Sequence, residues 1–274
     1  MRRSLPALLV AAMCAVAGFV VWIVATRTAW GLSLDEHLLA GFAGLERPRV
    51  EAVAEPVASL FDPGGFAILA LGLVGVALAR RRVRLAVVVA VVLAAANVTT
   101  QALKQGLPTG LTGDIGPGVG SWPSGHTTAA MVVALCAVLV SAPRWRPVVA
   151  AAGGLLAIAV VYSLLILQRH YPSDIVGGYL VAACWTAIGV AALNGTRSPA
   201  AQARAAAARV RTVVGVAAAA AALGVAVAAG VAVSRPAEAL AYADEHTLWV
   251  AGAVALAGAA LAVATATAAA IREN

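Results

Sequence analysis

The sequence predicts an all-α membrane protein whose helices cross the bilayer several times. Of its 274 residues, 62% are hydrophobic and only 11% are charged, which is not the composition of a soluble domain of this length. The apolar residues gather into runs of about 20, the length that spans a bilayer as a helix. The net charge of +7 comes from arginines scattered between these runs, which favours an orientation signal over nucleic-acid binding.

About eight segments qualify as spans by length and composition. They are residues 5–25, 64–79, 85–103, 124–141, 148–167, 174–193, 213–233 and 248–271. The first follows Arg2 and Arg3 as a signal peptide would, but no small-residue cleavage site comes after it, so we expect an uncleaved span. The three cysteines lie inside apolar runs without metal-ligand spacing, and we expect them to be inert.

The arginines predict how the chain is oriented in a plasma membrane. Most of the 19 lysines and arginines lie in alternate joints between the runs, which are residues 2–3, 80–84, 144–146, 197–211 and 272. The positive-inside rule places these joints in the cytoplasm, together with both termini. The intervening joints are then extracytoplasmic. They include residues 105–121, residues 168–174, and residues 27–62, an outer loop with an amphipathic stretch around 38–57.

The spans and joints suggest three regions: a six-span core at 1–194, a cytoplasmic linker at 195–211 and a two-helix extension at 212–274. Two similar triplets, Asp35-Glu36-His37 and Asp244-Glu245-His246, fall in predicted outer loops. They hint that the last two helices repeat the first two. The triplets are either solvated residues that mark membrane boundaries or a metal-binding or substrate-gating feature.

The segment Trp122-Pro123-Ser124-Gly125-His126 lies at the mouth of a long apolar run. An ionisable side chain at the start of a membrane span is costly and indicates function. Ser124 can cap the helix, and the free N–H groups of Gly125 and His126 then point out of its positive end. Such a helix terminus is suited to binding phosphate.

Lys104, His170 and Asp174 are predicted to lie on the same side of the membrane as His126. A carboxylate bound to one imidazole nitrogen fixes the tautomer and leaves the other nitrogen free to attack. A second histidine can deliver a proton to a leaving oxygen. Lys104 and the helix terminus supply positive potential for phosphoryl oxygens. This combination predicts phosphoryl transfer.

Lys104, Pro123-Ser124-Gly125-His126 and His170 with Asp174, in this order, resemble the motifs of the type 2 phosphatidic acid phosphatase superfamily of membrane lipid phosphatases, which read KxxxxxxRP, PSGH and SRxxxxxHxxxD. The resemblance implies a six-helix core, no cofactor and no metal. It implies that His170 forms a phosphohistidine, that Asp174 orients it and that His126 is the general acid. Lys104, Ser124 and Gly125 would bind the phosphate of a lipid phosphate or polyprenyl diphosphate at the extracytoplasmic face.

The first and third motifs are degenerate. Leu111 and Thr112 stand where Arg-Pro is expected, and Leu164 follows Ser163 where the third motif has arginine. Arg169 is a candidate replacement for binding phosphate, with Thr109 or Thr112 as weaker neutral donors.

Because one arginine can contribute roughly 10³ to 10⁵ in phosphoryl-transfer rate, the alternative is a catalytically impaired lipid-phosphate binder or membrane scaffold. The number of spans also admits a small-solute transporter, but charged residues at mid-membrane and interrupted half-helices in matching positions are missing from the sequence.

Overall fold

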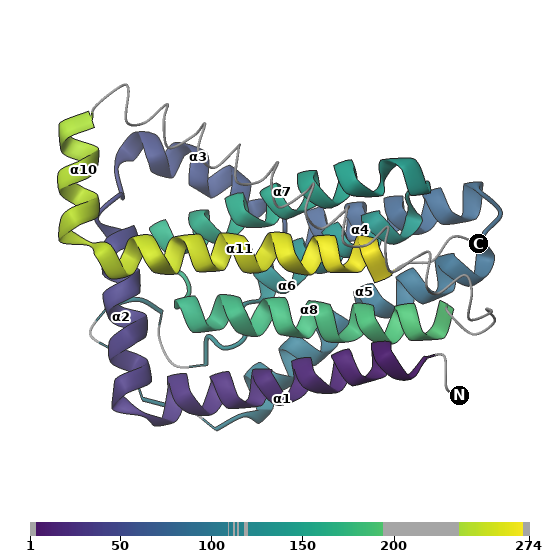
Figure 1. The fold of residues 1–274 in the computed structure, drawn as a ribbon, viewed down its shortest axis with the longest axis horizontal. Helices are drawn as coiled ribbons and strands as arrows, with labels where there is room; N and C mark the ends of the chain where they lie inside the picture. Colours follow the sequence, from purple (N-terminus) through teal and green to yellow (C-terminus); the bar gives the residue numbers. More distant parts are fainter. Residues whose placement is uncertain are drawn as a thin grey trace.

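The computed structural model describes residues 4–108, 110–111, 113, 115–117, 120–193 and 236–270, and this part of the chain contains helices and no strands (Figure 1). The prediction of an all-α membrane bundle is confirmed. Five helices are long and apolar enough to cross a membrane. They are α1 (Leu5–Arg27), α5 (Val83–Gly106), α7 (Arg146–Ile166, preceded by the short η1, Pro143–Trp145), α8 (Pro172–Leu193) and α11 (Thr247–Ala270).

The second predicted span, residues 64–79, is one helix that belongs to a bent pair. Helices α3 (Pro48–Ser59) and α4 (Pro63–Ala79) meet at 52° and together pass as one further span. The break lies at residues 60–62, directly before Pro63, which begins α4 because proline lacks the N–H that would continue the preceding helix. The count of about eight spans stays a prediction, since the seventh candidate, residues 213–233, lies outside the described residues.

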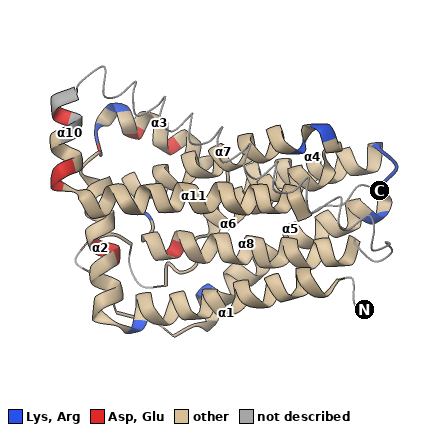
Figure 2. Cartoon of the chain, in the orientation of Figure 1, with Lys and Arg blue, Asp and Glu red and all other residues tan. Residues whose placement is uncertain are grey.

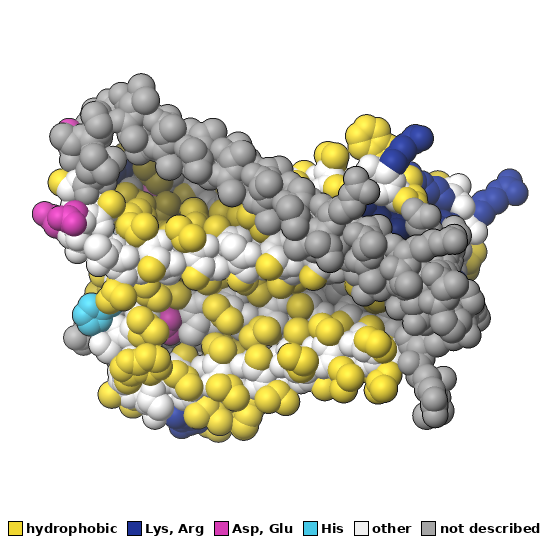
Figure 3. Space-filling view, in the orientation of Figure 1, with side chains coloured by type: hydrophobic (Ala, Val, Ile, Leu, Met, Phe, Trp, Pro, Cys, Tyr) yellow, Lys and Arg dark blue, Asp and Glu magenta, His cyan; other side chains and the backbone are white. Residues whose placement is uncertain are grey.

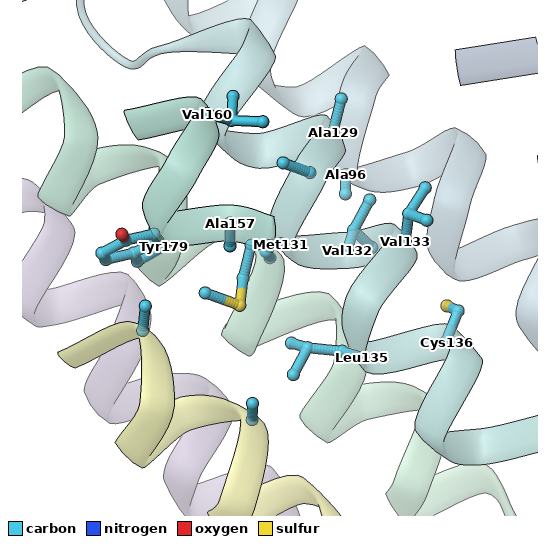
Figure 4. Packing of buried hydrophobic residues seen from close by; sticks show 14 of the residues in the cluster. Ala96, Ala129, Met131, Val132, Val133, Leu135, Cys136, Ala157, Val160 and Tyr179 are labelled. Carbon is cyan, nitrogen blue, oxygen red and sulfur yellow. The ribbon is translucent and has the colours of Figure 1, made fainter. Parts of the chain in front are cut away.

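Helix α6 (Gly125–Val140) forms the centre of the bundle and packs against α4, α5, α7, α8 and α11. It is apolar on all sides, as expected of a helix that is surrounded by protein. Met131 and Leu135 are fully buried, and Figure 4 shows them among Ala157 of α7 and Tyr179 of α8. This packing fixes the position of the turn that opens α6.

Residues 27–62, expected as an outer loop with one amphipathic stretch, are mostly helical. They form α2 (Ala29–Ala43), which lies across one end of the bundle, followed by α3 (Figure 1). Thr28 caps α2 by accepting a hydrogen bond from the Gly31 N–H at 3.0 Å. Leu39 and Phe42 are fully buried against the core, so tertiary packing stabilises this helix.

The C-terminal helices α10 (Pro236–Glu245) and α11 pack onto the rest of the bundle. The Trp249 ring lies edge-on to Phe42 of α2 with centroids 5.7 Å apart, and the Tyr242 hydroxyl donates to the Gly41 carbonyl at 2.5 Å. The predicted linker, residues 195–211, lies outside the described residues.

Charge and hydrophobicity divide the surface as a membrane protein requires. Figure 2 shows several Lys and Arg at the end of the bundle where α4 meets α5, and others on α3 and near the junction of α1 and α2; Asp and Glu lie mainly at this second end, beside α2, α3 and α10. Hydrophobic side chains cover the faces of α1, α8 and α11 between these ends (Figure 3). The pattern agrees with a bundle that crosses the bilayer along its helices.

Candidate functional site

His170 and Asp174 form a buried pair at the turn between α7 and α8. Helix α8 (Pro172–Leu193) begins between them, so Asp174 lies in its first turn. The Asp174 Oδ2 atom lies 3.1 Å from His170 Nδ1 and accepts a hydrogen bond from the Tyr171 N–H at 2.9 Å. Because the two side chains are only 9% and 3% exposed, the carboxylate holds the imidazole in one orientation away from bulk water.

Asp35 of α2 extends this buried cluster, and its burial contradicts the expectation of a solvated loop residue. Its two carboxylate oxygens accept hydrogen bonds from the Ser173 N–H at 2.9 Å and the Ser173 hydroxyl at 2.5 Å. Burial raises the pKa of Asp35 to about 6, although the bonds from Ser173 oppose this shift. Asp35 therefore fixes the start of α8 directly beside Asp174.

The second triplet is also helical in part. Asp244 and Glu245 end α10, and His246 stacks on Tyr242 with ring centroids 4.2 Å apart. These residues have no equivalent of the Asp35–Ser173 contact in the described part of the chain. The two triplets thus differ in their structural roles.

Ser124 caps α6 as predicted and joins this helix to α8. Its Oγ accepts hydrogen bonds from the Thr127 N–H at 3.3 Å and the Thr127 hydroxyl at 2.9 Å. Its own N–H donates to the Asp174 carbonyl at 2.9 Å. A Cβ on Gly178 would lie 3.0 Å from the Ser124 carbonyl oxygen, so glycine permits this close approach. The turn before His126 is therefore packed on the first turns of α8.

His126 is held by a carboxylate that the sequence did not indicate. Its Nε2 lies 2.9 Å from Oδ1 of Asp62, the residue that precedes α4. The side chains are 28% and 56% exposed, so this pair is open to solvent, unlike the pair at His170. The two histidines therefore have different surroundings, one suited to holding a fixed tautomer and the other to exchanging protons with water.

Lys104 lies in the last turn of α5 and lines a small cavity of about 50 Å³ together with Asp174 and Asp35. Neither His126 nor His170 is among the described residues that line it. Thr100, one turn earlier, donates to the Thr128 hydroxyl of α6 at 3.1 Å. This contact anchors the end of α5 beside the start of α6.

Leucines occupy the two positions where the family motifs have arginine, and they supply no guanidinium there. Leu164 is fully buried in the core, and Leu111 is 50% exposed. Arg169 donates to Glu55 of α3 at 2.5 Å, and both side chains are exposed. Arg169 must leave this partner to bind a phosphate. Thr109 and Thr112 lie outside the described residues.

The structure thus gathers Ser124, Gly125, Lys104, His170 and Asp174 at the same end of the bundle, around the starts of α6 and α8. It directs the side chains of His126 and Arg169 to the partners Asp62 and Glu55. The cluster combines an oriented imidazole, a helix N-terminus and one cation, which are the groups that phosphoryl transfer requires.

Comparisons with known proteins bear on the family and the fold. The family profile of the PAP2 superfamily matches residues 85–198, which include every predicted site residue. A search of curated proteins finds no match. Among solved structures, a transmembrane PAP2-type phosphatidylglycerolphosphate phosphatase from Bacillus subtilis is similar, with a TM-score of 0.53 and 19% identity over 69% of this chain and 94% of that one. At this identity the likeness concerns the fold.

Proposed function

Because the chain belongs to the PAP2 superfamily, we propose that it is a membrane-integral phosphatase that hydrolyses a lipid phosphate or polyprenyl diphosphate at the extracytoplasmic face of the plasma membrane. The observation that carries this proposal is the buried His170–Asp174 pair, whose helix is bonded through Ser124 to the phosphate-binding turn of α6. A histidine fixed in one tautomer beside a helix N-terminus and Lys104 is suited to attack phosphorus.

The first step forms a phosphohistidine. The ring nitrogen of His170 that faces away from Asp174 attacks the phosphorus, and the bond from phosphorus to the leaving oxygen breaks. His126 gives its proton to that oxygen, so the lipid leaves as an alcohol, or as a monophosphate from a diphosphate substrate. Asp174 stabilises the positive charge that develops on His170.

The second step releases phosphate. His126, now neutral, removes a proton from a water molecule that attacks the phosphohistidine, and the nitrogen–phosphorus bond breaks. In both steps Lys104 and the N–H groups at Gly125 and His126 stabilise the phosphoryl oxygens. The exposure of the His126–Asp62 pair fits this role, because protons must pass between His126 and solvent.

Phosphate release from purified protein in detergent tests the proposal. A panel of lipid phosphates and diphosphates, with and without a chelator, should yield inorganic phosphate from the parent protein. His170→Ala should abolish release. Equal release by parent and variant would refute the assignment of His170.

One observation favours a second function, a catalytically impaired member that binds lipid phosphates or acts as a membrane scaffold. Leucines occupy two arginine positions of the family motifs, and Arg169 is paired with Glu55. A parent protein that binds lipid phosphate but releases none would establish this alternative.

A further inference from the structure

A second cavity, of about 300 Å³, lies between α1, α5 and α8. Its walls are almost entirely apolar and include Cys14 and Trp22 of α1, Leu103 of α5, and Leu180 and Cys184 of α8. The volume falls at the low end of the range for ligand sites, about 300–1,000 Å³. All three helices are membrane-spanning candidates, so the cavity lies at hydrocarbon depth rather than in water.

This apolar groove adjoins the polar cavity at Lys104. Four residues line both: Trp22, Leu103, Leu107 and Trp122. The two tryptophans mark the passage from apolar to polar walls, as tryptophan does at membrane interfaces. A molecule that fills both cavities must therefore carry an apolar chain at one end and a group attracted to Lys104 at the other.

We propose that the groove between α1, α5 and α8 holds one hydrocarbon chain of the lipid substrate while its phosphate occupies the polar end. This inference rests on the proposed function for the identity of the phosphate-bearing ligand. A chain that moves from the bilayer into the groove exchanges one apolar surrounding for another, so little hydrophobic free energy is gained. The groove serves instead to position the phosphate near Lys104 and near Asp174, the partner of His170.

Cys14 and Met13 are adjacent on α1 and provide a matched pair of variants. Cys14 lines the groove, whereas Met13 does not and is 70% exposed. Cys14→Phe should fill the groove, and Met13→Phe should leave it open. For Cys14→Phe, kcat/KM should fall at least about tenfold for a long-chain lipid phosphate and stay within about twofold for a short-chain, water-soluble one, because only the long chain needs positioning. Met13→Phe should change neither.

Photolabelling gives a readout that does not need turnover. A long-chain lipid phosphate with a diazirine in its chain should form adducts on α1 near Cys14 and on α8 near Cys184. An excess of unlabelled lipid phosphate should suppress these adducts, and so should Cys14→Phe, but Met13→Phe should not.

The outcomes separate this inference from the proposed function. Adducts in the groove without any phosphate release would support the groove and refute the phosphatase. If Cys14→Phe lowered kcat/KM equally for long-chain and short-chain substrates, the proposal that the groove binds the chain would be overturned, and the phosphatase activity would still be supported. If phosphatidylcholine suppressed the photolabelling as effectively as lipid phosphate, the proposal would also be overturned, because the groove would then bind lipids without regard to their headgroup.

Discussion

Asp174→Asn separates the chemical role of this residue from its structural role. The asparagine side chain would still accept the hydrogen bond that the Tyr171 N–H now donates at 2.9 Å. The same atom, Oδ2, lies 3.1 Å from His170 Nδ1, so the asparagine oxygen keeps both contacts and only the negative charge is lost. The tautomer of His170 is then kept, but the positive charge that develops on its imidazole during attack is no longer stabilised.

The size of the effect follows from burial. With side chains only 9% and 3% exposed, water does not replace the lost carboxylate. Removing one partner of a buried charge pair costs about 3–5 kcal/mol, and we expect kcat to fall on the order of 10² to 10³-fold. KM should stay constant or fall, because Asp174 no longer offsets the charge of Lys104, with which it interacts.

The assay measures kcat and KM for phosphate release in detergent, with thermal unfolding to verify folding. Asp62→Asn is the matched control, since it makes the same change at the carboxylate of the other histidine. That pair is exposed, and an exposed ion pair contributes about 0–1 kcal/mol. The kcat of Asp62→Asn should therefore fall about fivefold at most. A kcat for Asp174→Asn above a tenth of the parent value would refute the reasoning.

Three further predictions concern neighbouring residues. Asp35→Asn keeps groups that can form hydrogen bonds with Ser173, but the asparagine side chain cannot ionise. Burial raises the pKa of Asp35 to about 6 in the folded protein, so ionisation favours the unfolded chain. As pH rises from about 4 through 6, the parent should therefore lose up to about 3 kcal/mol of stability relative to the variant. Melting temperatures across this range test it, and a constant difference would contradict it. Gly178→Ala places a Cβ 2.9 Å from the Thr127 Cβ and should cost about 1–3 kcal/mol and reduce phosphate release. Gly75→Ala, with open space around it, should be neutral or stabilising in the same melting assay. Lys104→Met should lower kcat/KM about 10²-fold in the phosphate-release assay, since one transition-state donor is lost, and an unchanged value would exclude Lys104 from the site.

Features set by local sequence could be predicted. The apolar runs predict the long helices, Ser124 is the N-cap of α6, and Pro172 begins α8 between His170 and Asp174. Each of these depends on residues within a few positions of one another. The spacing of Asp35, Leu39 and Phe42 also fits one face of a helix and could have revealed α2 and a buried carboxylate.

Contacts between distant segments could not be predicted from the chain alone. Asp35 meets Ser173 across 138 positions, Asp62 meets His126 across 64, and Glu55 meets Arg169 across 114. A carboxylate in a connecting segment has the same sequence signature whether it is solvated or paired. Only the packing of α2 against α8, of α3 against α7 and of α4 against α6 reveals these partners.

The central claim is that His170 carries the phosphoryl group during turnover. Rapid quenching of the parent protein with a lipid phosphate labelled at phosphorus, followed by digestion under alkaline conditions, measures this directly. We predict an acid-labile phosphate bound to the peptide that contains His170, and its absence from His170→Asn. Turnover without any bound phosphate, with equal turnover by the variant, would contradict the claim.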